Sequence, residues 1–204
     1  MPAKLISIIG PPASGKTTLA EALVAELPAT LIREDYAGNP FLAESYLGRS
    51  EARLPGQLYF LVSRVGQLAS SNWPGAGLYV SDYGFCQDRI YARARLSADD
   101  FRLYDRVARR LEGLVRPADL LLALDAAEAT LLERIARRGR EFERVMDQKF
   151  LASMRAAYNE ASRRASCPVI RLDCDEIDLR DPARRAPVVW QIGEALHTGG
   201  YEHG

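Results

Sequence analysis

The stretch SIIGPPASGKTTLAEAL, residues 7–23, places glycines and prolines between an apolar run and a helix-forming run. Its middle part, residues 10–17, fits the pattern G-x-x-x-x-G-K-[ST] of a phosphate-binding loop. Glycines let such a backbone turn where side chains would block it, so that amide groups and the following helix N-terminus converge on an anion. The stretch therefore predicts a strand, a loop that binds a nucleoside triphosphate, and a helix.

Residues of this loop are expected to hold the nucleotide together. Lys16 would reach the β- and γ-phosphates, and the Thr17 hydroxyl would bind Mg²⁺. The expected nucleotide-binding residues are Gly10, Pro11, Pro12, Ala13, Ser14, Gly15, Lys16, Thr17 and Thr18. The group that receives the phosphoryl must be found from other segments.

Composition places the chain among ordinary globular proteins and narrows its partners. It has 204 residues, 48% hydrophobic and 26% charged, with no formal net charge and a pI of about 6.8. This balance gives no bulk attraction to nucleic acid or to an acidic membrane, and no apolar run approaches the about 20 residues of a membrane helix. The three cysteines lack metal-ligand spacing. They predict reduced thiols in a cytoplasmic protein.

Apolar runs and helical patterns alternate along the chain, which predicts an α/β fold with a parallel sheet covered on both faces. We expect one domain over residues 1–204, with a frayed tail at about 198–204. Strands are expected at 4–9, 29–33, 77–82, 119–124 and 168–172. Helices are expected at 16–27, 55–70, 84–94, 98–115, 126–138, 144–165 and 184–196.

An acidic pair, Glu34 and Asp35, follows the second expected strand. Ligands of such sheets bind beyond the carboxyl ends of the strands, so a carboxylate there could accept the proton of an attacking hydroxyl group. A solvated acidic turn explains the same residues, because acidic side chains are common in loops. This segment alone leaves both interpretations open.

Polar residues on two later segments suit a planar base or a metal. Gln57 and Arg64 lie seven residues apart and share one face of the helix expected at 55–70. Asp82 ends the third strand, where a carboxylate can hold Mg²⁺ opposite the phosphate loop, and Asp88 follows it. Solvated polar residues, and a helix cap at Asp82, are the alternative explanations. The apolar stripe of the helix would be Leu58, Leu61, Val62, Val65 and Leu68.

Arginines gather after the fourth expected strand, at Arg134, Arg137, Arg138, Arg140 and Arg144. Arg134 and Arg138 are four residues apart, so their like charges project together and cost about 0.2–0.5 kcal/mol on an isolated helix. A bound polyanion would offset that cost, and arginine bonds phosphate through two prongs. A solvated face paired with nearby glutamates is the alternative, as is a nucleic-acid patch, although the rest of the chain is not basic.

Together these segments resemble the deoxynucleoside kinase family over about residues 7–158. The pieces that carry the resemblance are GPPASGKTT, RED…NPFLAESY, GQLYFLVSR, SDYGFCQDRIYA, PADLLLALDA and ERIARRGREFE. The resemblance implies a P-loop kinase fold with a five-stranded parallel sheet and an arginine-rich lid at about 137–144. It also implies a homodimer, for which the helices at 55–70 and 84–94 are candidate faces.

The resemblance also implies a role for each matching residue. Glu34 would take the proton from the 5′-hydroxyl of the nucleoside, and Asp82 would lie near the metal. Tyr46 and Glu143 would hold the 3′-hydroxyl. The residues that read the base would be Gln57, Arg64 and Asp88, and the arginines that close over the phosphates would be Arg134, Arg138 and Arg140.

One position departs from the family pattern. Many members carry an acidic residue followed by Arg-Ser, whereas this chain has Asp82, Tyr83 and Gly84. The missing arginine would touch the substrate and the transferring phosphoryl group. Substrate range and catalytic power are therefore the least determined properties of this sequence.

The expected reaction is transfer of the γ-phosphoryl group of ATP, bound with Mg²⁺, to the 5′-oxygen of a deoxynucleoside, with purines favoured. Two alternatives stay open. A nucleoside monophosphate kinase would need a basic clamp on the acceptor, for which Arg33, Arg49 and Arg53 are available. A nucleotide-binding protein with weak or lost catalysis would fit Tyr83. The adenine of ATP is expected near residues 171–176.

Overall fold

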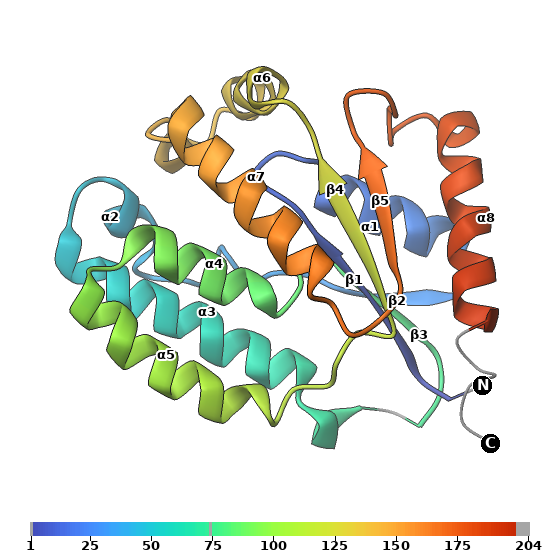
Figure 1. Cartoon of the computed structure of the whole chain (residues 1–204), viewed down its shortest axis with the longest axis horizontal. Helices are drawn as coiled ribbons and strands as arrows, with labels where there is room; N and C mark the ends of the chain where they lie inside the picture. Colours follow the sequence, from blue (N-terminus) through green and yellow to red (C-terminus); the bar gives the residue numbers. More distant parts are fainter. Residues whose placement is uncertain (1, 74, 199–204) are drawn as a thin grey trace.

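A computed structural model describes residues 2–73 and 75–198 of the chain. Its sheet has five parallel strands in the order β2-β3-β1-β4-β5 (Figure 1). The strands are β1 (Lys4–Ile9), β2 (Ala29–Ile32), β3 (Leu78–Ser81), β4 (Leu120–Asp125) and β5 (Val169–Asp173). The predicted α/β fold with a five-stranded parallel sheet is confirmed.

Helices connect the strands and cover both faces of the sheet (Figure 1). They are α1 (Lys16–Glu26), α2 (Leu42–Tyr46), α3 (Arg53–Leu68), α4 (Cys86–Arg95), α5 (Ala98–Glu112), α6 (Glu128–Arg138), α7 (Gln148–Arg163) and α8 (Pro182–Thr198). Within the described part of the chain, none of them is long and apolar enough to span a bilayer.

The expected helix boundaries differ from the observed ones by up to four residues. The helix expected from residue 144 begins at Gln148, because the Asp147 side chain accepts a hydrogen bond from the Phe150 amide at 2.7 Å and caps it. The expected tail included Thr198, which belongs to α8, and the rest of that tail lies outside the described residues. Short helical segments were not expected at all: α2 and the 3₁₀ turns Ser50–Ala52, Ser70–Asn72 and Glu141–Glu143.

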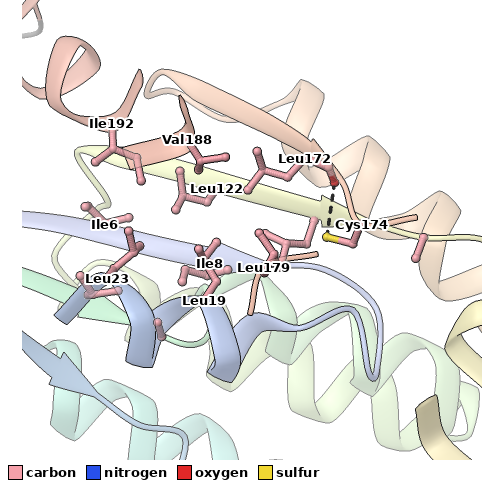
Figure 2. Packing of buried hydrophobic residues seen from close by; sticks show 14 of the residues in the cluster. Ile6, Ile8, Leu19, Leu23, Leu122, Leu172, Cys174, Leu179, Val188 and Ile192 are labelled. Carbon is pink, nitrogen blue, oxygen red and sulfur yellow. Dashed lines mark hydrogen bonds between the residues drawn. The ribbon is translucent and has the colours of Figure 1, made fainter. Parts of the chain in front are cut away.

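Alternating side chains of the central strands build two cores. Ile6 and Ile8 of β1 point to the face covered by α1 and α8, where they meet Leu19, Leu23, Val188 and Ile192 (Figure 2). Ile9 and Leu121 point to the other face and pack with Met154 and Tyr158 of α7. Strands buried on both faces are apolar at nearly every position, which explains the run LLLAL of β4 and the apolar residues on either side of Ser7 in β1.

Helices α3, α4 and α5 pack together beside the sheet and share a core of their own (Figure 1). The apolar stripe predicted for α3 is partly wrong, because Val62 is 61% exposed. The helix instead buries Gln57 and Arg64 together with Leu61 and Leu68. Two polar side chains that could have been solvated therefore lie inside the molecule.

Candidate active site

The phosphate loop lies between β1 and α1 and begins with a close backbone approach at Gly10. A Cβ atom on Gly10 would lie 2.5 Å from the Leu124 carbonyl oxygen, and φ there is +155°, so only glycine suits the position. The Ser14 amide then donates to the Pro11 carbonyl at 3.3 Å, and Gly15 leads into α1. The loop therefore sits at the N-terminus of a helix, where an anion is favoured.

The Lys16 side chain folds back on this loop. Its ammonium donates to the carbonyl oxygens of Gly10 and Pro11, at 2.8 and 2.9 Å. Burial lowers the pKa of Lys16 to about 8, although the nearby Glu34 carboxylate favours the charged form. The ammonium is thus held at the loop, where bound phosphates would meet it.

A cavity of 540 Å³ opens over the loop, and we call it the donor cavity. Arginines from two parts of the chain line it: Arg134, Arg137, Arg138, Arg140, Arg180 and Arg184. Arg134 is anchored across the loop by hydrogen bonds to the carbonyls of Cys174, at 2.7 Å, and Ser14, at 3.5 Å. So many guanidinium groups around a helix N-terminus suit a polyanion such as a triphosphate.

Some of these contributions were not expected. Arg180 and Arg184 belong to the segment after β5, where no motif marks them. Residues 174–179 also line the donor cavity, and they include 174–176 of the stretch 171–176 in which adenine contacts were expected. Arg144, the last of the clustered arginines, is exposed and lines neither the donor cavity nor the second cavity described below.

Asp82 lies opposite the loop, directly after β3. The Thr17 hydroxyl donates to Asp82 Oδ2 at 2.9 Å, and the Glu34 amide donates to Oδ1 at 2.8 Å. Asp82 is not a helix cap, because Phe85 precedes α4. No cluster of three or more metal-ligating side chains occurs in the described ranges. One hydroxyl and one carboxylate are nevertheless the hard oxygen donors that suit Mg²⁺ carried on phosphates.

Glu34 follows β2 and lines both the donor cavity and a second cavity beside it. The Arg64 guanidinium bridges Glu34 and Asp88, so one buried cation joins two carboxylates. Burial raises the pKa of Asp88 to about 6, and the Arg64 charge opposes that rise. Glu34 is therefore part of a buried charge network and not a solvated acidic turn.

The second cavity, which we call the acceptor cavity, measures 80 Å³. Its polar lining includes Glu34, Gln57, Arg64 and Gln87. Aromatic rings form most of the remaining wall: Tyr36, Tyr46, Phe60, Tyr91 and Phe142. A slot with aromatic walls and a polar edge suits a planar base. Of these rings only Tyr46 was expected, although Phe60 lies three residues after Gln57 and so shares its helix face.

The segment after α6 closes the acceptor cavity. Glu143 is buried and accepts from Arg138 Nε at 2.9 Å and from Arg140 Nη1 at 3.5 Å. The Arg140 guanidinium lies 4.3 Å from the centre of the Tyr36 ring. Tyr46 lies in the same wall, and its ring centroid is 5.5 Å from that of Phe142. Tyr46 and Glu143 thus line one cavity without a hydrogen bond between them in the described structure.

The residues that supported the alternative functions lie away from this cavity. Tyr83 is fully buried, donates to Gln67 Oε1 at 2.6 Å, and stacks under Arg64. Arg33 pairs with Glu21, Arg49 pairs with Glu44, and Arg53 lines a different surface pocket. In the described part of the chain these three arginines do not form the basic clamp that the monophosphate kinase alternative would need.

The sequence pattern of deoxynucleoside kinases matches residues 6–196. The chain belongs to the deoxynucleoside kinase family. This kinase is 30% identical to deoxyadenosine kinase of Dictyostelium discoideum, over 90% of this chain and 77% of that protein. It is also 30% identical to deoxyguanosine kinase of Bacillus subtilis, over 78% of each chain. Membership makes the protein a phosphotransferase that phosphorylates deoxynucleosides from a nucleotide donor.

Solved structures share the fold of this deoxynucleoside kinase. Deoxyadenosine kinase from M. mycoides, solved with dCMP and dCDP, superposes with a TM-score of 0.80 at 18% identity, over 93% of this chain and 98% of the other. The same enzyme with dATP gives a TM-score of 0.79 at 20% identity, over 93% and 99%. The P-loop kinase fold inferred from the sequence is thus confirmed.

Proposed function

We propose that this kinase transfers the γ-phosphoryl group of ATP to the 5′-oxygen of a deoxynucleoside, with purines preferred. The observation that carries the proposal is the position of Glu34, which lines both the donor and the acceptor cavity. A carboxylate at that junction can take the proton of a sugar hydroxyl while the oxygen attacks a phosphorus on the other side.

The donor cavity would hold the triphosphate. The loop amides and the N-terminus of α1 would donate hydrogen bonds to phosphate oxygens. The Lys16 ammonium would leave the carbonyls of Gly10 and Pro11 and bind these phosphate oxygens instead. Thr17 and Asp82 would hold Mg²⁺, which neutralises part of the phosphate charge when bound. Arg134, Arg138 and Arg140 would stabilise the charge that spreads over the transferring group.

The acceptor cavity would hold the nucleoside. Gln57 and Arg64 line this cavity and can offer donors and an acceptor to the edge of a base whose faces lie between aromatic rings. Asp88 does not line the cavity and would act on the base through Arg64, with which it pairs. Deoxyadenosine and deoxyguanosine kinases are among the relatives, which supports a purine preference. A third relative, a deoxyadenosine/deoxycytidine kinase that is 27% identical, makes deoxycytidine the competing substrate to measure.

Binding requires the lid, about residues 137–144, to open and close. At 80 Å³ the acceptor cavity is far below the about 300–1,000 Å³ of ordinary ligand pockets. The lid residues Arg140 and Phe142 must therefore move away from the rings of Tyr36 and Tyr46 to admit a nucleoside. When the lid closes, the Glu143 carboxylate would give up its hydrogen bond from Arg138 and accept one from the 3′-hydroxyl, beside Tyr46. Arg138 would then turn to the phosphates.

We also propose a cytoplasmic homodimer. Exposed apolar side chains lie on α3 (Val62) and on α5 (Leu103 and Val107), two helices that pack against each other. These helices, and not α4, offer the dimer face, because α4 is packed between α3, α5 and α7. The free thiols of Cys86, Cys167 and Cys174 suit a reducing compartment.

A substrate panel tests the proposed reaction. Each of the four deoxynucleosides, and each of their monophosphates, is incubated with ATP and Mg²⁺, and the nucleotide products are separated. We expect deoxyadenosine or deoxyguanosine to give the highest kcat/KM and the monophosphates to give no product. Turnover of thymidine alone would refute the purine preference, and turnover of monophosphates alone would refute the acceptor class.

A further inference from the structure

We infer that Gln87 is a positioning residue that holds the Glu34 carboxylate, an inference that rests on the proposed role of Glu34 as the base. Gln87 is 3% exposed and lines both cavities. Its Nε2 atom donates to Glu34 Oε1 at 3.0 Å. An ionised carboxylate only accepts hydrogen bonds, so the nitrogen of the amide must be the atom that faces Glu34.

The backbone before α4 places Gln87 at this point. Gly84 passes so close to β1 that a Cβ atom on it would lie 2.4 Å from Ile9 Cγ2. The backbone amide of Gln87 donates a hydrogen bond to the Gly84 carbonyl at 3.0 Å, which closes the first turn of α4 against that strand. The start of α4 is thereby fixed beside the carboxyl end of β2, where Glu34 lies.

Two donors meet on one oxygen of Glu34. Arg64 and Gln87 both donate to Oε1, from α3 and from α4. In the described structure Oε2 accepts no hydrogen bond, so it is the oxygen left for a sugar hydroxyl. Anchoring one oxygen from two helices fixes the rotation of the carboxylate and aims the other oxygen, which is the geometry that proton transfer needs.

Gln87 carries no charge, and this matters as much as its position. Arg64 shares its charge between Glu34 and Asp88. A cation at position 87 would place two positive charges against one oxygen of Glu34, and the two would repel each other. Tyr83 supplies no donor here, because its hydroxyl points to Gln67. An amide adds a fixed hydrogen bond without adding charge.

The other end of the amide argues against a purely structural role. Gln87 Oε1 is buried and has no hydrogen-bond partner in the described structure. A buried carbonyl without a hydrogen-bond partner destabilises the fold, so an apolar side chain would serve packing better. The amide is explained if its nitrogen is required by Glu34.

The experiment compares Gln87→Met with Gln67→Met in steady-state kinetics. Methionine has a similar volume and no donor. We expect Gln87→Met to lower kcat about 10- to 100-fold, the range for a misplaced catalytic group, with KM for the deoxynucleoside changed by less than about threefold. Gln67 pairs with Tyr83 and with the Arg33 carbonyl and lines neither cavity, so its substitution should leave kcat unchanged.

A double-mutant cycle shows whether Gln87 acts through Glu34. In the Glu34→Gln background, Gln87→Met should lower kcat by less than about twofold, because no carboxylate remains to be positioned. A near-isosteric variant, Gln87→Glu, serves if Gln87→Met does not fold. It removes the donor and places a second carboxylate against the first, so kcat should fall at least as far as in Gln87→Met.

These measurements separate this inference from the proposed function. If Glu34→Gln keeps the full rate, the base assignment fails and the role of Gln87 fails with it. If Glu34→Gln is impaired while Gln87→Met and Gln87→Glu behave as wild type, only the role of Gln87 is refuted. An equal loss from Gln87→Met in both backgrounds would also refute it, because Gln87 would then act elsewhere.

Discussion

Lys16 meets the carbonyls of Gly10 and Pro11 where a triphosphate would place its oxygens. Burial lowers the pKa of this lysine to about 8, so in the free enzyme the ammonium loses its proton only slightly above neutral pH. A neutral amine cannot attract phosphate oxygens. Since the charged form binds the anion, ATP binding should be linked to protonation of Lys16.

ATP affinity should therefore fall as pH rises through about 8. Isothermal titration of the enzyme with ATP between about pH 6.5 and 9.5 measures this dependence. In Lys16→Arg the guanidinium stays charged over the whole range, so the fall should disappear even if affinity is lower throughout. Wild-type affinity that stays constant up to pH 9.5 would contradict the account of Lys16.

Single residues differ in how far the sequence predicts them. Lys16, Thr17 and Asp82 could be placed because a loop motif or a strand end fixes their position. Gln87 carries no such signal, since an amide in the first turn of a helix is ordinary. Its importance comes from a contact with Glu34, 53 residues earlier in the chain, which only the packing of α4 against the sheet creates.

Among the elements, the turn from β3 into α4 is where close packing sets the site. Glycine at position 84 is required by the approach to Ile9, whereas a Cβ atom on Gly113, after α5, would meet nothing within 4 Å. The two glycines therefore have different reasons to be present. Gly84 allows the close contact with Ile9 on which the positions of Asp82 and Gln87 depend, whereas Gly113 ends the surface helix α5.

Substituting alanine at both positions tests this difference. Gly84→Ala should lower the free energy of unfolding by about 1–3 kcal/mol, because the added methyl group overpacks the β1 contact. Gly113→Ala, where φ is −68°, should leave stability unchanged or raise it by up to about 1 kcal/mol. Urea unfolding measures both. Equal effects of the two substitutions would show that the β1 contact is not tight.

Long elements with a clear period were predictable, and short ones were not. Strands β1 and β4 appear as apolar runs, and Ser97 begins α5 with a side chain that accepts from the Asp100 amide at 3.1 Å. Helix α2 spans five residues, too few to show a period. The 3₁₀ turn Glu141–Glu143 was not expected either, because three residues are too few to show a period.

On the scale of the whole molecule, apolar surface gathers on the helices farthest from β5. Val62 on α3 and both Leu103 and Val107 on α5 are exposed. Trp190 is exposed on α8, at the other end of the molecule (Figure 1). Only the α3 part of this face was predicted, as a candidate dimer helix. The sequence places Val62 in the apolar stripe of α3, and the exposure of Val62 depends on where α4 and α5 pack.

Light scattering after size exclusion tests the dimer. The wild-type protein should have twice the mass of one 22.6 kDa chain. The double variant Val62→Glu/Leu103→Glu should have the mass of the monomer, because a dimer of it would bury charge in an apolar interface. Trp190→Glu changes an equally exposed apolar residue away from that face and should remain dimeric. A monomeric wild type, or a dimeric double variant, would contradict the proposed face.

The proposed reaction depends on Glu34, which would accept the proton of the nucleoside hydroxyl. Asp35 provides a matched control, because it is the neighbouring carboxylate, accepts from the Tyr59 hydroxyl at 2.6 Å, and lines neither cavity. Both Glu34→Gln and Asp35→Asn remove one negative charge. Only the first removes the group at the junction of the two cavities.

The most direct measurement is the single-turnover rate of 5′-phosphorylation with saturating ATP and deoxynucleoside. We predict that Glu34→Gln lowers this rate by about two to four orders of magnitude, while it still binds nucleoside and unfolds cooperatively. Asp35→Asn should react close to the wild-type rate. A folded, nucleoside-bound Glu34→Gln enzyme that reacts at the wild-type rate would contradict the account.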